Sequence, residues 1–350
     1  MSEPRVTILI PSHRRPALLA RALEHYAPSG LPVIVADSTP EPFARAGEFP
    51  RLQYLHLPDV PFEAKLQRLA GLVATPYAVL CADDDFTSCA SILRCAEFLD
   101  AHPDHSGAHG HYLRVLRGAG QTLVEPCYRD THRAGIAAAD PAQRLLELNL
   151  PYVPLFYAVL RAEVLRQAFG PGHERERFYA ASELALGLAA AILGRVAVLP
   201  TLHTVRDIVP SMDLGGVKNH NLLVVSTAPQ YREAYGGFVL RMAALLEGTS
   251  GLDSQSALVA VLASLDGFIE GYCQPGRRRS FVQKLPKYCR RAAHALLPPL
   301  AAHARREAER QREAELDAYL APAGPQARVE LARILERFEA PAKASPATRG

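Results

Sequence analysis

The first hundred residues alternate between short apolar runs and segments with helical spacing, and this alternation constrains the fold more than any other feature. Runs rich in β-branched and aromatic residues predict strands at 6–10, 33–37, 52–57 and 77–81. Segments with apolar residues on one helical face predict helices at 14–26, 62–73 and 88–99. Apolar strands separated by helices are typical of a parallel sheet covered on both faces. We therefore predict an α/β fold.

Beyond residue 105 the pattern is less regular. We predict strands at 109–116 and 196–199, a hairpin turn at 118–120, and helices at 142–148, 158–169 and 182–193. A polar loop at 211–221 precedes segments predicted to be helical at 231–246, 254–272, 300–320 and 328–338. The chain thus divides into an α/β domain over 1–210, a helical extension over 211–340 and a flexible tail over 341–350.

Composition excludes several classes of protein. Of the 350 residues, 49% are hydrophobic and 21% are charged, which is typical of a soluble globular protein. The sequence lacks an apolar run long enough for a membrane-spanning helix, and its N-terminus lacks a signal-peptide core. Six cysteines without a CxxC pair favour reduced thiols, so we expect a cytoplasmic protein. The net charge of +3 is too small to indicate nucleic acid as a partner.

Polar side chains follow three of the predicted strands. The first strand ends in Pro11-Ser12-His13-Arg14-Arg15, the second in Asp37-Ser38-Thr39 and the fourth in Asp83-Asp84-Asp85. Because the carboxyl ends of parallel strands meet at one edge of a sheet, we expect these groups to lie close together. Carboxylates facing a basic turn are suited to a divalent cation that bridges a diphosphate.

Several common catalytic motifs are absent from the sequence. No GxxxxGK[ST] or GxGxxG follows a strand, which excludes the P-loop and the dinucleotide fingerprint. No HExxH or GxSxG occurs either, which removes the commonest metalloprotease and α/β-hydrolase signals.

The three strand-end motifs, in this order and spacing, resemble those of inverting nucleotide-sugar glycosyltransferases of the GT-A, family-2 type. The apolar strand 6–10 followed by Pro11-Ser12-His13-Arg14-Arg15, the segment Val35-Ala36-Asp37-Ser38, and the DxD motif Leu80-Cys81-Ala82-Asp83-Asp84-Asp85 carry the resemblance, which covers residues 5–210. It implies a GT-A fold, a mostly parallel sheet with flanking helices, and transfer of a sugar from a nucleoside diphosphate to a hydroxyl acceptor with inversion.

The resemblance also implies a role for individual residues on the donor side. The residues implied to line the nucleotide pocket are Pro11, Ser12 and Arg14, with Asp37 at the base or ribose. Ala36 and Ser38 depart from the Asp and Gly of the family's Val-Asp-Asp-Gly-Ser pattern. Candidates near the base and diphosphate are Lys65, Gln67 and Arg68, among which the choice stays open. Within the triplet, Asp83 is implied to contact the ribose, Asp84 to belong to the donor site, and Asp85 to bind Mg²⁺ or Mn²⁺.

The general base and the last donor groups are implied to lie further along the chain. Glu183, in Phe178-Tyr179-Ala180-Ala181-Ser182-Glu183-Leu184, lies where the family places the carboxylate that takes the acceptor proton. A role as an ordinary helix-start carboxylate stays open, because the family's Glu-Asp doublet is missing. His203 is implied to complete the metal site and Arg206 the diphosphate site, and a satisfied strand-end histidine is the alternative for His203.

The partners implied are a nucleoside-diphosphate sugar and a glycan or lipid-linked acceptor, as in bacterial surface-polysaccharide assembly. The segment 277–291 carries seven cations, no acid and interleaved apolar residues, so it is either a surface for anionic membrane at the inner face of the cell membrane or a solvated basic helix. Two other functions stay open. One is a non-catalytic sugar-nucleotide or glycan-binding module. The other is a nucleotidyltransferase, which the lack of glycine in Pro11-Ser12-His13-Arg14-Arg15 disfavours.

Overall fold

The computed structural model of the chain describes residues 3–118, 121–128, 135–178, 180–208, 222–273 and 298–339. Five predicted features lie wholly or partly outside these ranges: the hairpin turn at 118–120, Tyr179, the loop at 211–221, the basic segment 277–291 and the tail 341–350. In the part that is described, no helix combines the length and apolar character needed to cross a bilayer.

Nine strands of the described residues form one mixed sheet, in the order β3-β2-β1-β4-β8-β6-β9-β5, with β7 beside β6. The strands are β1 (Val6–Ser12), β2 (Val33–Asp37), β3 (Leu52–His56), β4 (Tyr77–Leu80), β5 (Phe86–Thr87), β6 (His105–Gly118), β7 (Gln121–Pro126), β8 (Val159–Arg161) and β9 (Arg195–Ile208). Strands β3, β2, β1 and β4 are parallel, as are β6 and β9. Strand β8 joins these two parallel groups by antiparallel pairing with β4 and with β6.

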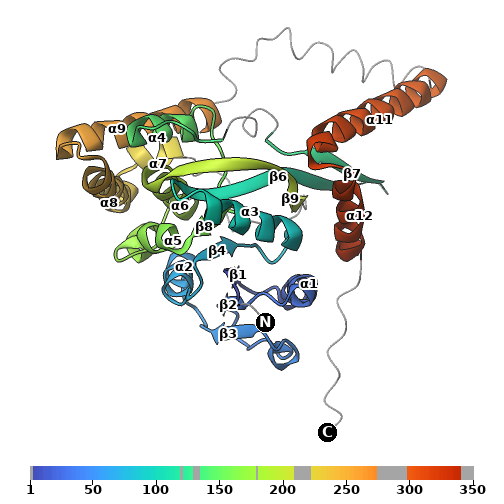
Figure 1. The fold of residues 1–350 in the computed structure, drawn as a ribbon, viewed down its shortest axis with the longest axis horizontal. Coiled ribbons are helices and arrows are strands. Elements are labelled where there is room, and N and C mark those ends of the chain that lie inside the picture. The colour runs from blue at the N-terminus through green and yellow to red at the C-terminus, as the bar shows by residue number, and fades with distance from the viewer. Residues whose placement is uncertain are drawn as a thin grey trace.

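Helices cover both faces of this sheet (Figure 1). They are α1 (Pro16–Tyr26), α2 (Phe62–Gly71), α3 (Cys89–Ala101), α4 (Pro141–Asn149), α5 (Ala162–Ala168), α6 (Ala181–Leu193), α7 (Leu222–Thr227), α8 (Arg232–Ser250), α9 (Ser254–Phe268), α11 (Pro298–Leu320) and α12 (Gln326–Glu339). Buried residues of α1 and α3 form one core with the sheet, and those of α2, α4, α5 and α6 form a second. A third buried cluster joins α11 and α12 to β5, β6 and β9. The second core continues into α8 and α9, which pack on α4 and α6.

The predicted fold class is confirmed, and the strand at 33–37 has the predicted ends. The prediction of one helix over 158–169 is wrong, because β8 occupies Val159–Arg161 before α5 begins. An apolar run of this length suits a strand or a helix equally well, and here the position between β4 and β6 decides for a strand. Strand β9 is also longer than predicted, so His203 and Arg206 lie within it rather than after it.

The helix α12 returns the chain to the first α/β unit. The buried Phe338 ring lies 4.6 Å from the Phe86 ring, between centroids. The Arg21 and Arg117 guanidinium groups lie over the Phe338 ring at 5.5 and 5.3 Å. Both also donate to the Phe338 carbonyl, at 3.3 and 3.4 Å. Phe338, near the end of α12, therefore contacts both Arg21 and Arg117, which are distant from it in the sequence.

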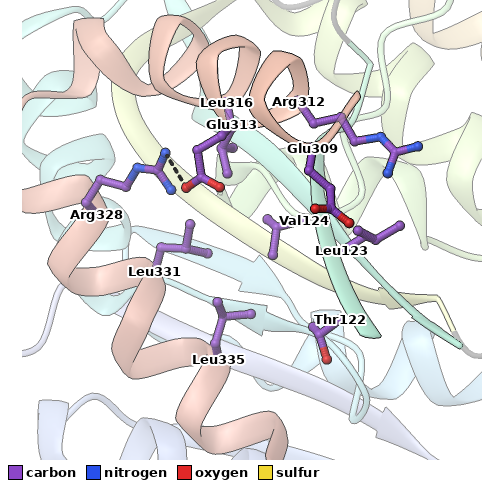
Figure 2. A pocket seen from close by; sticks show the side chains of 10 residues that line it. All are labelled: Thr122, Leu123, Val124, Glu309, Arg312, Glu313, Leu316, Arg328, Leu331 and Leu335. Carbon is purple, nitrogen blue, oxygen red and sulfur yellow. Dashed lines mark ion pairs between the residues drawn. The ribbon is translucent and has the colours of Figure 1, made fainter. Parts of the chain in front are cut away.

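A groove of about 490 Å³ lies between β7, α11 and α12 (Figure 2). Leu123, Val124, Leu316, Leu331 and Leu335 form its apolar part, and Glu309, Arg312, Glu313 and Arg328 form its charged part. An ion pair of 3.7 Å joins Arg328 and Glu313 across one end. None of the predicted site residues lines this groove.

We expect the Phe338→Ala variant to lose about 3 kcal/mol of unfolding free energy, because it leaves a cavity and removes the ring beneath two guanidinium groups. Urea unfolding followed by circular dichroism measures the loss. Val329→Ala, in the same helix but 55% exposed, is the control and should change stability by less than about 0.5 kcal/mol. Equal effects of the two substitutions would contradict the docking of α12 described above.

Candidate functional site

The acid triplet, defined as Asp83, Asp84 and Asp85, lies between β4 and β5 and is buried. The Ser12 hydroxyl donates to Asp83 Oδ2 at 2.8 Å. The Arg15 Nη1 donates to Asp83 Oδ1 at 3.1 Å and to Asp84 Oδ2 at 3.0 Å. The structure thus places one cation between two carboxylates, which reduces the cost of burying them together.

Asp85 is held by a separate set of donors. The backbone N–H of Asp207 donates to Asp85 Oδ1 at 2.8 Å. The Tyr157 hydroxyl and the Arg206 Nε, the latter at 3.2 Å, donate to Asp85 Oδ2. Arg206 in turn donates from Nη1 to the Tyr128 hydroxyl at 2.7 Å. Both oxygens of Asp85 therefore accept hydrogen bonds from protein groups.

Burial shifts the protonation of the triplet. It raises the pKa of Asp83, and the neighbouring Asp84 carboxylate adds to this effect. Burial also raises the pKa of Asp85 to about 6, although the Arg206 guanidinium opposes the shift. The cations Arg15 and Arg206 favour the ionised carboxylates and so oppose the effect of burial.

The ends of β1 and β2 complete the same region. The register of the two strands pairs Ser12 with Asp37. The Asp37 carboxylate accepts from the Thr39 N–H and from the Tyr54 hydroxyl, each at 2.9 Å. Positions 12, 37 and 83–85, distant in sequence, are therefore brought together as predicted.

Lys65 of α2 hydrogen-bonds to residues at the ends of both β1 and β2. Its Nζ donates to the Ser12 carbonyl at 2.6 Å and to the Ser38 hydroxyl at 2.9 Å. Burial lowers the pKa of Lys65 to about 8, although Asp37 and Asp83 favour its charged form. Of the three candidates on α2, Lys65 is the one that the structure places at the strand ends.

Other predicted donor residues lie at the margin of this region or away from it. Pro11 is half-buried beside Ala36 in the sheet. Arg14 is exposed, with a left-handed φ of 54°, and its N–H donates to Thr39 Oγ1 at 2.7 Å. Gln67 donates instead to the Gly170 carbonyl and to Glu174, each at 3.2 Å, and Arg68 is exposed.

His203 is fully buried, and both of its ring nitrogens are engaged. Nε2 lies 2.8 Å from the Tyr157 carbonyl, which only accepts, so Nε2 carries the hydrogen. Nδ1 then accepts from the Ser91 hydroxyl at 2.7 Å. Burial lowers the pKa of His203 to about 3. The structure therefore does not present His203 to the acid triplet with a nitrogen that is able to bind a metal.

Glu183 lies in the first turn of α6, as predicted. Its Oε1 accepts a hydrogen bond from the Tyr152 hydroxyl. Arg206, also predicted, is brought directly to Asp85.

The sequence pattern did not identify several groups that contact the triplet or its partner Arg206. Arg15, not Arg14, reaches the carboxylates, and the two adjacent arginines gave no basis for choosing between them. Tyr157 precedes β8 and Tyr128 follows β7, in segments that carry no predicted motif, so their roles depend on how these strands pair. The backbone N–H of Asp207 carries no signal in the side-chain pattern.

Comparisons with known proteins come from structure alone, since no family model and no curated protein matches this chain. The structure of S. aureus TarS 1-349 aligns with a TM-score of 0.54 at 11% identity, covering 95% of this chain and 89% of that one. The same fragment in complex with UDP aligns at 0.53 and 12%, covering 81% and 78%. Its complex with UDP-GlcNAc gives 0.53 at 11%, with the same coverage.

The fold is of the GT-A type. This confirms the fold that the strand-end motifs implied. At 11–12% identity the likeness to TarS concerns the fold, and the chemistry has to be argued from the residues of this chain.

We expect the His203→Gln variant to show a shallower loss of stability in acid. The folded chain holds His203 neutral down to a pKa of about 3, whereas the unfolded chain protonates it near 6.5. This contribution to stability is present above pH 6.5 and is lost as the pH falls, at about 1.4 kcal/mol per pH unit. Urea unfolding at several pH values between 6.5 and 4 measures the slope.

The exposed His102 supplies the control for this experiment. His102→Gln should leave the slope unchanged. A His203→Gln slope equal to that of the wild type would contradict the buried, neutral state of this side chain.

Proposed function

We propose that this chain is a glycosyltransferase that moves a sugar from a nucleoside-diphosphate sugar to a hydroxyl acceptor with inversion. The observation that carries the proposal is the network at the ends of β1, β2 and β4, in which the acid triplet is bound by Arg15 and Arg206. It lies on a fold shared with TarS, whose structures include complexes with UDP and UDP-GlcNAc. Two observations therefore support a nucleotide-sugar donor: the fold shared with TarS, and the pairing of the acid triplet with Arg15 and Arg206.

On the donor side, this chain's own residues divide into anionic and cationic groups. Asp37, held by Tyr54, offers a carboxylate to the base or ribose, and Asp83 offers one to the ribose. Arg15 and Arg206 are the cations that would transfer from carboxylate to diphosphate oxygens when the donor binds. Guanidinium groups suit this role because their planar forks bind phosphate oxygens as well as carboxylates.

The acid triplet fits a divalent cation that arrives with the donor. Among the described residues, no group of three or more His, Cys, Asp or Glu side chains forms a ready-made metal site. Mg²⁺ is commonly held by one or two carboxylates together with substrate phosphates, and the oxygens of Asp85 match this chemistry. The bound cation would stabilise the charge of the departing diphosphate. Asp85 must then release the bond from Tyr157 or from Arg206.

On the acceptor side, Glu183 is the proposed base. Its carboxylate takes the proton from the acceptor hydroxyl as the hydroxyl oxygen attacks the anomeric carbon. The bond from the sugar to the diphosphate breaks in the same step, and the diphosphate leaves with the nucleoside. We also propose a glycan or lipid-linked acceptor, which rests on the sequence pattern of 277–291 and on the family resemblance.

We expect the wild-type protein to release nucleoside diphosphate from at least one sugar nucleotide in the presence of Mg²⁺ or Mn²⁺ and an acceptor. Asp85→Asn should lower this rate at least a hundredfold, because the variant lacks the charge that holds the metal–diphosphate group. A coupled assay over a panel of donors measures release. Asp266→Asn, an exposed position on α9, is the control and should keep the wild-type rate.

Two outcomes would replace the proposal. Saturable donor binding without turnover would favour the non-catalytic binding module. Release of pyrophosphate from a nucleoside triphosphate and a sugar phosphate would favour a nucleotidyltransferase.

We expect Mn²⁺ and UDP to bind cooperatively. Mn²⁺ alone has to displace hydrogen bonds from Asp85, whereas in the presence of UDP the phosphates supply further oxygen ligands. Electron paramagnetic resonance of free Mn²⁺ should show at least tenfold tighter binding when UDP is present. Asp85→Asn should abolish this gain, and Asp266→Asn should retain it. Equal Mn²⁺ affinity with and without UDP would contradict the proposed site.

A further inference from the structure

The helix α6, which carries Glu183, begins without a side-chain cap. Ala180 is at the cap position, with a left-handed φ of 68° and no side-chain group that accepts a hydrogen bond. Helix starts are usually held by Ser, Thr, Asp or Asn at this position, because their side chains satisfy the first N–H groups. The first turn of α6 therefore depends on other contacts for its position.

One such contact is a buried polar chain that ends at Ser182. The His173 Nε2 lies 3.1 Å from the Ser182 hydroxyl, and its Nδ1 lies 2.9 Å from Glu176 Oε2. His173 is fully buried, and Ser182 and Glu176 are nearly so. Because a carboxylate only accepts, Nδ1 carries the hydrogen and donates it to Glu176, while Nε2 hydrogen-bonds with the Ser182 hydroxyl.

The chain continues into the helical extension. Arg241 of α8 donates to Glu176 through Nε and Nη2, each at 2.7 Å, in a bidentate pair. Burial favours a higher pKa for Glu176, but the bonds from Arg241 and His173 lower it, so Glu176 stays ionised. A helix from residues beyond 211 thus reaches the residue next to Glu183 through three consecutive polar contacts.

A second contact reaches Glu183 itself. The Tyr152 hydroxyl donates to Glu183 Oε1. The Tyr152 ring lies edge-on against Phe268 of α9, with 4.8 Å between centroids. The start of α6 and the carboxylate that it carries are therefore held from two sides, once through α8 and once through α9.

We propose that α8 and α9 are part of the acceptor side of the site, with Arg241, His173 and Tyr152 as positioning residues for Glu183. The inference rests on the proposed function, since it assigns these residues to a base that acts in transfer. A buried ionic pair is a weak source of stability but fixes geometry well, which suits a role in orienting Glu183. The helices α8 and α9 then position the proposed base as well as packing on α4 and α6.

Two variants of the full-length chain test the proposal. Arg241→Gln breaks the bidentate pair, and we expect at least a tenfold loss of kcat with less than a twofold change in the Kd for UDP. Hydrogen–deuterium exchange should become faster over residues 180–186 and stay unchanged in β1. Arg241→Lys, which keeps the charge, should recover part of kcat. Arg232→Gln, exposed on the same helix, is the matched control and should behave like the wild type.

Tyr152→Phe removes one hydroxyl and keeps the ring against Phe268. A carboxylate that loses a hydrogen-bond donor holds its proton more tightly, so the acid limb of the kcat profile should move to higher pH. A purely structural role would leave this limb in place. An unmoved acid limb, or unchanged exchange over 180–186 in Arg241→Gln, would overturn the inference.

The two proposals fail in different ways. If the wild type releases no nucleoside diphosphate from any donor, the proposed function fails, together with the catalytic part of this inference. The exchange measurement needs no turnover, so it still decides whether α8 holds the start of α6.

Discussion

Burial of three adjacent carboxylates is the constraint on which the rest of the site depends. A charge removed from water is costly unless it is paired and hydrogen-bonded, and the acid triplet places three such groups in consecutive positions. The partners come from four places in the chain: Ser12 in β1, Arg15 before α1, Tyr157 before β8, and Arg206 with Asp207 in β9. The triplet is satisfied only when these segments have assembled, so the same contacts stabilise the fold and shape the candidate site.

Local pattern predicted the first α/β units well, because β1, β2 and β4 are largely apolar and buried and each helix has a clear apolar face. The strand 33–37 is an example, since its ends in sequence and structure coincide. Pattern failed for β8, whose three residues become a strand through pairing with β4 and β6. It also missed β5 and β7, two strands set by antiparallel partners rather than by their own sequence.

The candidate site was predictable where function depends on a strand end and unpredictable where it depends on long-range packing. Ser12 and Asp37 end β1 and β2, and the triplet follows β4, so their proximity follows from the parallel topology. Lys65 was one of three candidates because helical phase alone does not fix which side chain points to the sheet. A satisfied histidine was one of the two interpretations of His203, but its partners Ser91 and Tyr157 could not be predicted, since both lie far from it along the chain.

The docking of Phe338 has a consequence for how the molecule is made. Its carbonyl binds Arg21, a residue 317 positions earlier, and Arg21 and Arg117 both pair with Asp207, whose N–H binds Asp85. A nascent chain that has not yet reached residue 338 lacks the contacts that Arg21 and Arg117 make with Phe338. Contacts between residues so far apart in sequence form late, because closing the long intervening loop costs conformational entropy before the contact stabilises the chain. The set of contacts that runs from Asp85 through Asp207 and Arg21 to Phe338 is therefore complete only after synthesis has passed residue 338.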